Sequence, residues 1–230
     1  VLILVPFQAT AEEVVFRGLF MQVLGSWLKN PWFAIMIPSV GFALAHTYTV
    51  VCADLRGYGD SGKPESDATH AAYAKRAMAQ DMVDVMRHFG FPRFRLAGHD
   101  RGGRVAHRLC VDHPQCVERV AVLDISPTRL MFGKTDQAFA TAYYHWFFLI
   151  QPFDLPERLI GADPLYYLRK KTAGWGSAAD IFDPRAFAEY ARCFADPATI
   201  HATCEDYRAA ASIDLVHDDV ALRCEDRDPL

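Results

Sequence analysis

The stretch Phe94-Arg-Leu-Ala-Gly98-His-Asp100-Arg-Gly102-Gly-Arg104 decides how the fold is interpreted. Its first residues form a short apolar strand, and Gly102 to Asp112 has a helical apolar face. The turn between them has the pattern Gly-x-Asp-x-Gly, in the strand–turn–helix context of a nucleophile elbow. Such a turn is too tight for side chains on either side of the nucleophile, which explains the glycines. The alternative is an ordinary glycine-rich turn in which Asp100 caps the helix.

An aspartate at the centre of this turn changes the chemistry expected of it. A carboxylate is ionised at neutral pH, so Asp100 needs no general base in order to attack. It would displace a leaving group at saturated carbon and become an ester. The backbone N–H of Arg101, at the helix N-terminus, favours negative charge nearby. The pattern therefore favours halide displacement or epoxide opening over an esterase mechanism.

Strands and helices alternate on both sides of the turn. Further short strands are predicted at Thr49–Ala53 and Val120–Leu123, and a helix at His70–Phe89. This alternation predicts an α/β protein with a parallel sheet. From Arg129 to Asp214 aromatic residues are dense and helical stretches follow one another, including 137–149 and 184–194. We therefore expect an α/β core at 48–128, a helical cap at 129–214 and a polar tail at 215–230.

Three motifs carry a resemblance to a known family: Cys52-Ala-Asp-Leu-Arg-Gly-Tyr-Gly59, Gly98-His-Asp-Arg-Gly-Gly-Arg104 and Leu123-Asp-Ile-Ser-Pro-Thr128. They resemble the fluoroacetate dehalogenases, the haloacetate-hydrolysing branch of the α/β-hydrolases, over about residues 48–219. The resemblance implies a partial α/β-hydrolase fold with a helical cap, and hydrolytic dehalogenation of a small haloacid by water. Asp100 would be the nucleophile, with no cofactor and no metal. Haloalkane dehalogenases and epoxide hydrolases are similar but typically have Trp after the nucleophile.

The resemblance also implies roles for charged residues near Asp100. Arg101 and Arg104 match the arginines that hold the substrate carboxylate, for which a guanidinium fork is well suited. Asp124 matches the acid that orients the catalytic histidine. The alternatives are two solvated helix arginines and an ordinary turn residue after a strand.

A halide pocket is implied by three further matches, at His145, Trp146 and Tyr207. Each side chain offers one hydrogen-bond donor on an apolar body, which suits a dry pocket for a leaving halide. Without the resemblance we would place these three residues in the core as ordinary aromatic side chains.

The chain departs from the family in its late histidine. Of His145, His201 and His217, which follow Asp124, none comes after a final strand. A His-Gly-x-Pro loop before the Thr49 strand is also missing. We therefore expect a fragment that lacks the catalytic histidine and the last two strands. Such a fragment could form the ester without hydrolysing it, or could be non-catalytic.

Residues 1–47 differ from the rest in composition. They contain two apolar stretches, Val14–Leu28 and Trp32–Ala45, each slightly short of the ~20 residues that span a bilayer. We expect an apolar helical segment, either associated with a membrane or buried as a hairpin.

This segment has a resemblance of its own. Glu12-Glu-Val-Val-Phe-Arg-Gly18 and Phe42-Ala-Leu-Ala-His46 resemble two motifs of the CPBP (CAAX-processing) intramembrane proteases. The resemblance implies that Glu12, Glu13 and His46 activate water. Glu13 and Arg17 would lie on one helical face. The alternative is an amphipathic helix with an ion pair, and the two resemblances together suggest a chimera.

The composition indicates which classes of partner and which cellular compartment to expect. The net charge of −4 without a basic stripe argues against nucleic acid as a partner. The six cysteines have no C-x-x-C spacing, so we expect reduced core thiols in a cytoplasmic protein. Nothing in the sequence indicates the oligomeric state.

Overall fold

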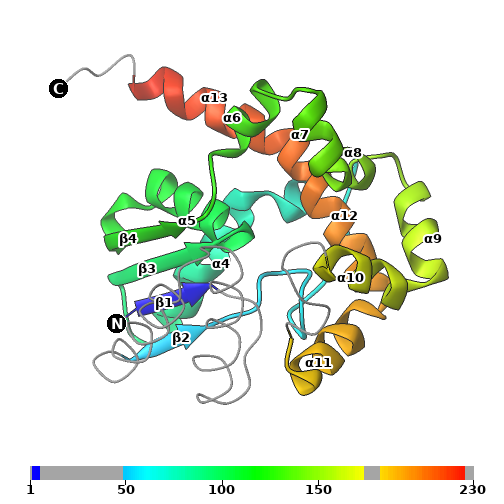
Figure 1. The fold of residues 1–230 in the computed structure, drawn as a ribbon. Helices are drawn as coiled ribbons and strands as arrows, with labels where there is room; N and C mark the ends of the chain where they lie inside the picture. Colours follow the sequence, from blue (N-terminus) through cyan, green and yellow to red (C-terminus); the bar gives the residue numbers. More distant parts are fainter. Residues whose placement is uncertain (1, 6–48, 174–181, 226–230) are drawn as a thin grey trace, which may run out of the picture.

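The computed structural model describes residues 2–5, 49–173 and 182–225. A parallel sheet lies on one side of the molecule and a group of helices on the other (Figure 1). The sheet has four strands in the order β2-β1-β3-β4, namely β1 Leu2–Val5, β2 Val50–Cys52, β3 Phe94–His99 and β4 Val117–Leu123. All three strand pairings are parallel, as the alternation of strands and helices predicts.

Two helices pack against the sheet, α4 (Lys75–His88) and α5 (Arg101–Asp112). Met78, Met82 and Met86 recur at helical spacing on α4, and each is at most 2% exposed. They share one core cluster with Phe94 of β3 and Leu109 of α5. Burial of each of these side chains stabilises the fold by about 1.5–3 kcal/mol. Periodic apolar burial therefore fixes these helices on the sheet.

The rest of the described chain is helical, as expected for the cap. Its elements are α6 Thr128–Gly133, α7 Gln137–Ala142, α8 Tyr144–Leu149, α9 Leu155–Ala162, α10 Pro164–Ala173, α11 Pro184–Phe194, α12 Pro197–Ala211 and α13 Ile213–Glu225. A second apolar cluster holds the cap together, built from Leu149, Ile160, Ile200 and Cys204. The single helix expected at 137–149 is instead two helices that meet at Tyr143.

The position of β1 corrects one expectation. Leu4 pairs with Cys52 on one side and with Ala97 on the other, so β1 lies inside the sheet. The prediction that residues 1–47 form an apolar helical segment is therefore wrong for Leu2–Val5, which form a strand. The physical reason is that a short continuous apolar run suits an inner strand of a parallel sheet as well as a helix, so its apolar content does not distinguish the two. The two longer apolar stretches lie outside the described residues.

The end of the chain corrects a second expectation. Helix α13 continues to Glu225, where we expected a polar tail from residue 215. Long-range ion pairs hold it: Arg108 contacts Asp218 at 3.4 Å, and Arg129 contacts Asp219 at 2.6 Å. Because these partners lie about a hundred positions away in sequence, no local pattern indicates them.

Five cysteines whose side chains the structure describes are free thiols. Cys116, Cys193 and Cys204 are buried and Cys110 is partly buried. Cys52 is exposed, so the expected core position is wrong for this residue. It lies on β2, at the edge of the sheet.

Candidate active site

The elbow is strained in the way that its sequence predicts. Asp100 separates β3 from α5 with φ 48° and ψ −115°, a conformation that side chains other than glycine rarely adopt. A Cβ atom on Gly98 would lie 2.4 Å from the carbonyl oxygen of Gly102. On Gly103 it would lie 3.0 Å from Ile125. The glycines are therefore required by the close approach of β3, α5 and the segment after β4.

Asp100 does not act as an ordinary helix cap. Its side chain makes no capping hydrogen bond to α5. In contrast, Asp136, Asp183 and Asp196 begin α7, α11 and α12, and each accepts a hydrogen bond from a backbone N–H of its helix. The Asp100 side chain is partly exposed. The alternative of a capping aspartate is therefore wrong, and the carboxylate is free of that local role.

Asp124 lies beside Asp100 at the carboxyl edge of the sheet. The two residues directly follow His99 and Leu123, which are paired between β3 and β4. Asp124 also has a positive φ, 52°. Burial raises its pKa, His99 opposes this, and the charge of Asp100 adds to the increase. Within the described ranges no histidine donates a hydrogen bond to Asp124.

Arg101 is held between the core and the cap. Its guanidinium group forms an ion pair with Asp206 of α12 and stacks over the ring of Tyr207, 3.8 Å from the centroid. Burial is the largest single effect and lowers the pKa of Arg101, but the electrostatic effects of Asp206, Tyr207 and Tyr58 together outweigh burial and leave the pKa well above its ordinary value. The charge of Asp100 acts in the same direction. Arg101 is therefore a fixed cation within electrostatic reach of the elbow.

Arg104 is buried one turn further along α5, with 8% of its surface exposed. It donates hydrogen bonds to the Ser126 carbonyl at 3.0 Å and to Thr128 Oγ1 at 2.9 Å. Its guanidinium carbon lies 4.7 Å from the centre of the Trp146 ring. Burial lowers its pKa, while the charge of Asp100 raises it. Burial of this kind excludes the alternative of two solvated arginines.

The three aromatic residues of the predicted halide pocket meet in the structure. The ring of Tyr207 lies 5.8 Å from that of His145 and 6.1 Å from that of Trp146, in edge-on contacts. His145 and Trp146 are 5% and 7% exposed. Burial, together with the charges of Lys171 and Arg101, lowers the pKa of His145 to about 3. His145 is therefore a neutral imidazole at pH 7.

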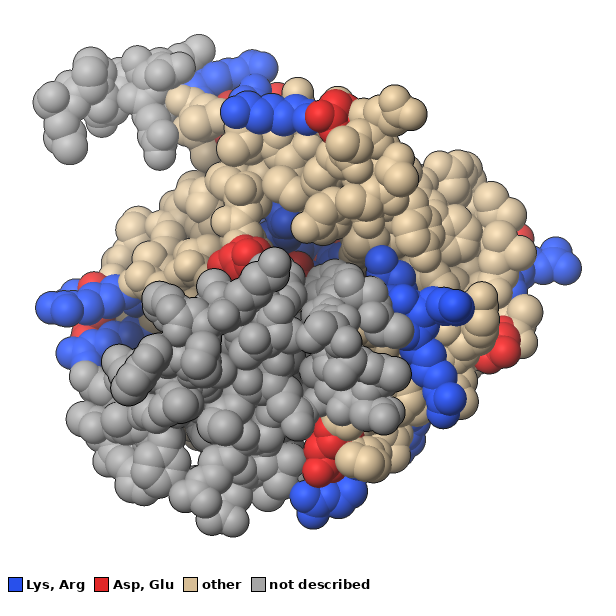
Figure 2. Space-filling model, in the orientation of Figure 1, with Lys and Arg blue, Asp and Glu red and all other residues tan. Residues whose placement is uncertain are grey.

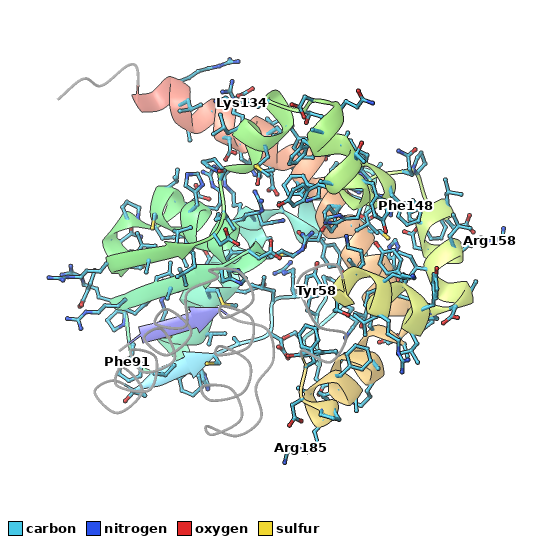
Figure 3. The ribbon with its side chains drawn as sticks, in the orientation of Figure 1. Tyr58, Phe91, Lys134, Phe148, Arg158 and Arg185 are labelled. Atoms are coloured by element: carbon cyan, nitrogen blue, oxygen red, sulfur yellow. The ribbon has the colours of Figure 1, made fainter. Side chains whose placement is uncertain are left out.

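A buried charge network joins this site to the cap, and sequence reasoning missed it. Asp206 is 0% exposed and accepts hydrogen bonds from Lys75, Arg101 and Tyr58. Tyr58 lies between the sheet and the cap helices (Figure 3). The motif around Tyr207 contains Glu205, Asp206 and Arg208 together, and three charges flanking a predicted pocket residue were the available signal. A run of charged residues on a helix usually faces solvent, so this pattern by itself indicates an exposed surface.

A cavity of about 80 Å³ lies beside Arg104. Its lining includes Lys75, His107 and Asp214 from three separate helices. Asp100 does not line it. Figure 2 shows basic side chains inside a hollow near the centre of this face, bordered by acidic ones.

The residues of the protease-like motifs, Glu12, Glu13, Arg17 and His46, lie outside the described residues. In the part of the chain that the structure describes, no helix is long and apolar enough to cross a membrane. The same ranges contain no group of three or more side chains placed to hold a metal ion.

Comparisons with known proteins agree with this geometry. The family model of the alpha/beta hydrolase fold matches residues 15–216, which include most of the segment given above to the protease resemblance. A fluoroacetate dehalogenase from Burkholderia sp is 53% identical over 185 residues, covering 79% of this chain and 61% of the relative. A soluble epoxide hydrolase from Corynebacterium sp. (strain C12) is 34% identical over 168 residues, covering 72% and 57%.

A solved structure, ALR0039 from Nostoc sp PCC 7120, superposes with a TM-score of 0.80 and 50% identity. The superposition covers 96% of this chain and 69% of the Nostoc chain. The chain spans about three fifths of the length of the two curated relatives. The residues that the family model matches make up most of the sequence, and they include the elbow, three strands of the parallel sheet and most of the cap. The chain belongs to the family of proteins with the α/β-hydrolase fold.

Proposed function

We propose that the protein is a hydrolytic dehalogenase that acts on haloacetate-type 2-haloacids through an aspartyl ester. One observation carries the proposal: a carboxylate without a capping role, Asp100, stands at a strained elbow within electrostatic reach of the partly buried Arg101 and the buried Arg104. The similarity to a fluoroacetate dehalogenase supports the same chemistry. Water is the second substrate, and no cofactor is invoked.

In the first step Asp100 attacks the carbon that bears the halogen. A carboxylate oxygen forms the new C–O bond while the carbon–halogen bond breaks, and the halide leaves with the electron pair. Arg101 and Arg104 would bind the substrate carboxylate, which fixes the carbon in line with the nucleophile. Both arginines already have protein partners, so the substrate would use their remaining N–H groups.

The halide would leave toward His145, Trp146 and Tyr207. The imidazole, the indole and the phenol each donate one hydrogen bond, and these bonds strengthen as negative charge develops on the halogen. The neutral state of His145 suits this role, because a neutral ring still carries one N–H.

The second step returns the aspartate by adding water to the ester. A histidine that takes a proton from water is required, and Asp124 would orient it. Since Asp124 accepts no hydrogen bond from a histidine within the described ranges, this step depends on a group outside them. We infer that the described residues alone form the ester faster than they hydrolyse it.

Opening of an epoxide is the second candidate, favoured by the similarity to a soluble epoxide hydrolase. The same carboxylate could attack an epoxide carbon. However, an epoxide has no carboxylate for Arg101 and Arg104 to bind. We therefore place haloacids first.

Incubation of the purified chain with chloroacetate tests the proposal, with halide release and intact mass measured together. We expect one equivalent of chloride and the added mass of one carboxymethyl group, mapped by proteolysis to Asp100. The free cysteines, above all the exposed Cys52, could also be alkylated. Treatment with hydroxylamine separates the two adducts, because it cleaves an ester and leaves a thioether intact.

The control is Asp100→Asn, which keeps the size of the side chain and removes its charge. Chloride release that continues after one equivalent would also support the attack step, with hydrolysis added. A folded wild-type chain that yields neither chloride nor an ester at Asp100 would overturn the proposal. In that case a terminal epoxide replaces chloroacetate, and an adduct at Asp100 would favour the second candidate.

A further inference from the structure

Lys171 contacts a ring of the predicted halide pocket from a separate helix. Its Nζ lies 2.9 Å from Nδ1 of His145, a hydrogen-bonding distance. Lys171 belongs to α10 and His145 to α8, so the contact depends on the packing of the cap. Lys171 is partly buried, and its Nζ also lies 5.0 Å from the centre of the Tyr144 ring. The lysine is therefore held on two sides by α8.

The chemistry of this contact decides which nitrogen of His145 carries the proton. A protonated lysine has three donors and no acceptor, so Nδ1 must accept the hydrogen bond. A neutral imidazole has one N–H, which must then be on Nε2. The ring of His145 is buried and makes an edge-on contact with Tyr207. A fixed Nε2–H gives the ring one defined donor, on the nitrogen that does not contact Lys171.

We propose that Lys171 is a positioning residue that holds His145 in the tautomer with its proton on Nε2. This keeps the His145 donor available to a leaving halide, and so the inference rests on the proposed function of the pocket. Without Lys171 a neutral histidine would exchange between its two tautomers, and in one of them Nε2 would present a lone pair to the anion. The ammonium group also adds positive charge near the pocket, which favours an anion there.

The comparison that isolates this role uses three variants. Lys171→Met removes both the charge and the donor while keeping a long side chain. Lys171→Arg restores a group that can only donate. Lys170→Met is the matched control, because Lys170 is the exposed neighbour on the same helix and its Nζ lies 5.5 Å from the Tyr166 ring instead.

Two measurements on the full chain report the role without catalysis. Long-range ¹H–¹⁵N spectra of protein with ¹⁵N-labelled histidine identify the tautomer of His145. The His145 signals are assigned as those that disappear in the variant His145→Gln. We expect the Nε2–H form in the wild type, in Lys171→Arg and in Lys170→Met, and a mixture in Lys171→Met. Bromide affinity, followed by quenching of tryptophan fluorescence, should fall about tenfold in Lys171→Met and recover in Lys171→Arg, as expected for loss of one charge-assisted hydrogen bond.

The proposal is overturned if the wild type has its proton on Nδ1, or if Lys171→Met keeps the tautomer and the bromide affinity of the wild type. Its failure differs from failure of the proposed function. If the tautomer and bromide affinity depend on Lys171 but chloroacetate forms no ester at Asp100, the positioning role stands and the dehalogenase assignment fails. If the ester forms at Asp100 but the tautomer of His145 does not depend on Lys171, the dehalogenase assignment stands and the positioning role fails.

Discussion

The phenol of Tyr58 donates a hydrogen bond of 2.6 Å to the carboxylate of Asp206, which is fully buried. Tyr58 belongs to the loop after β2 and Asp206 to the cap helix α12, so the bond joins the two halves of the molecule. Lys75 and Arg101 neutralise the same carboxylate. Burial raises the pKa of Asp206, but Arg101 and Lys75, together with the hydrogen bond from Tyr58, outweigh burial and lower the pKa to about 2. The cap is therefore attached to the core through a charge that is already balanced.

Loss of the Asp206 charge should destabilise the protein far more than loss of the Tyr58 hydroxyl. Asp206→Asn leaves Lys75 and Arg101 buried without this anion, which we expect to lower the free energy of unfolding by about 3–5 kcal/mol. Tyr58→Phe removes one of several donors and should cost about 1 kcal/mol. Urea denaturation followed by circular dichroism measures both. Equal losses in the two variants would mean that the network is not charge-balanced as described.

The elbow should not tolerate a methyl group at Gly98. In Gly98→Ala the new Cβ would meet backbone atoms of Gly102 at 2.4 Å, and backbone cannot move aside without displacing α5. We expect a loss of about 4 kcal/mol or more in the free energy of unfolding, or no folding. The matched control is Gly62→Ala, where nothing lies within 4 Å of the new Cβ. That variant should change stability by less than about 0.5 kcal/mol, and a comparable loss in both would contradict the strained turn.

Stability should fall as the pH falls below neutral, with His145 as one cause. Its pKa is about 3 in the folded protein against an ordinary value of 6.5, so the unfolded chain takes up this proton first as the pH decreases. The contribution is complete above the ordinary pKa and is lost between about pH 6.5 and pH 3. Between pH 7 and pH 5 we expect His145 to account for a loss of about 2 kcal/mol.

The measurement is urea denaturation at both pH values, compared between the wild type and His145→Gln. His217, whose pKa is also lowered by burial, adds to the decrease in both proteins, and so the difference between them isolates His145. If the variant loses as much stability as the wild type, the imidazole is not buried in its neutral form.

The rate of ester formation at Asp100 should depend strongly on Arg104 for reagents that have a carboxylate, and only weakly for reagents that lack one. Arg104→Lys keeps the charge but loses the planar fork, so the rate of ester formation at Asp100 with low concentrations of bromoacetate should fall about 10- to 100-fold. Bromoacetamide has the same leaving group without the carboxylate, and its rate at Asp100 should be nearly unchanged. Mass spectrometry of the peptide that contains Asp100 follows both reactions. A similar decrease for both reagents would assign Arg104 a purely structural role.

Much of the site could be predicted from the sequence because its constraints are local. The glycines around Asp100 are required by a turn of a few residues, and the apolar spacing of α4 is set by the helical period. The strand at Phe94, the helix after Gly102 and the helical cap follow from such patterns. The roles proposed for His145, Trp146 and Tyr207 rest on a resemblance, and the structure adds that their rings are in contact.

Only the tertiary structure decided which polar residues are buried and what they contact. Asp206, Lys75 and Lys171 look like ordinary charged residues of helices, because their partners lie on other elements. The place of β1 inside the sheet and the extent of α13 depend on partners that lie many residues away along the chain. A sequence specifies local backbone geometry through sterics and periodicity. Pairing of charges across the fold depends on packing, which no local pattern records.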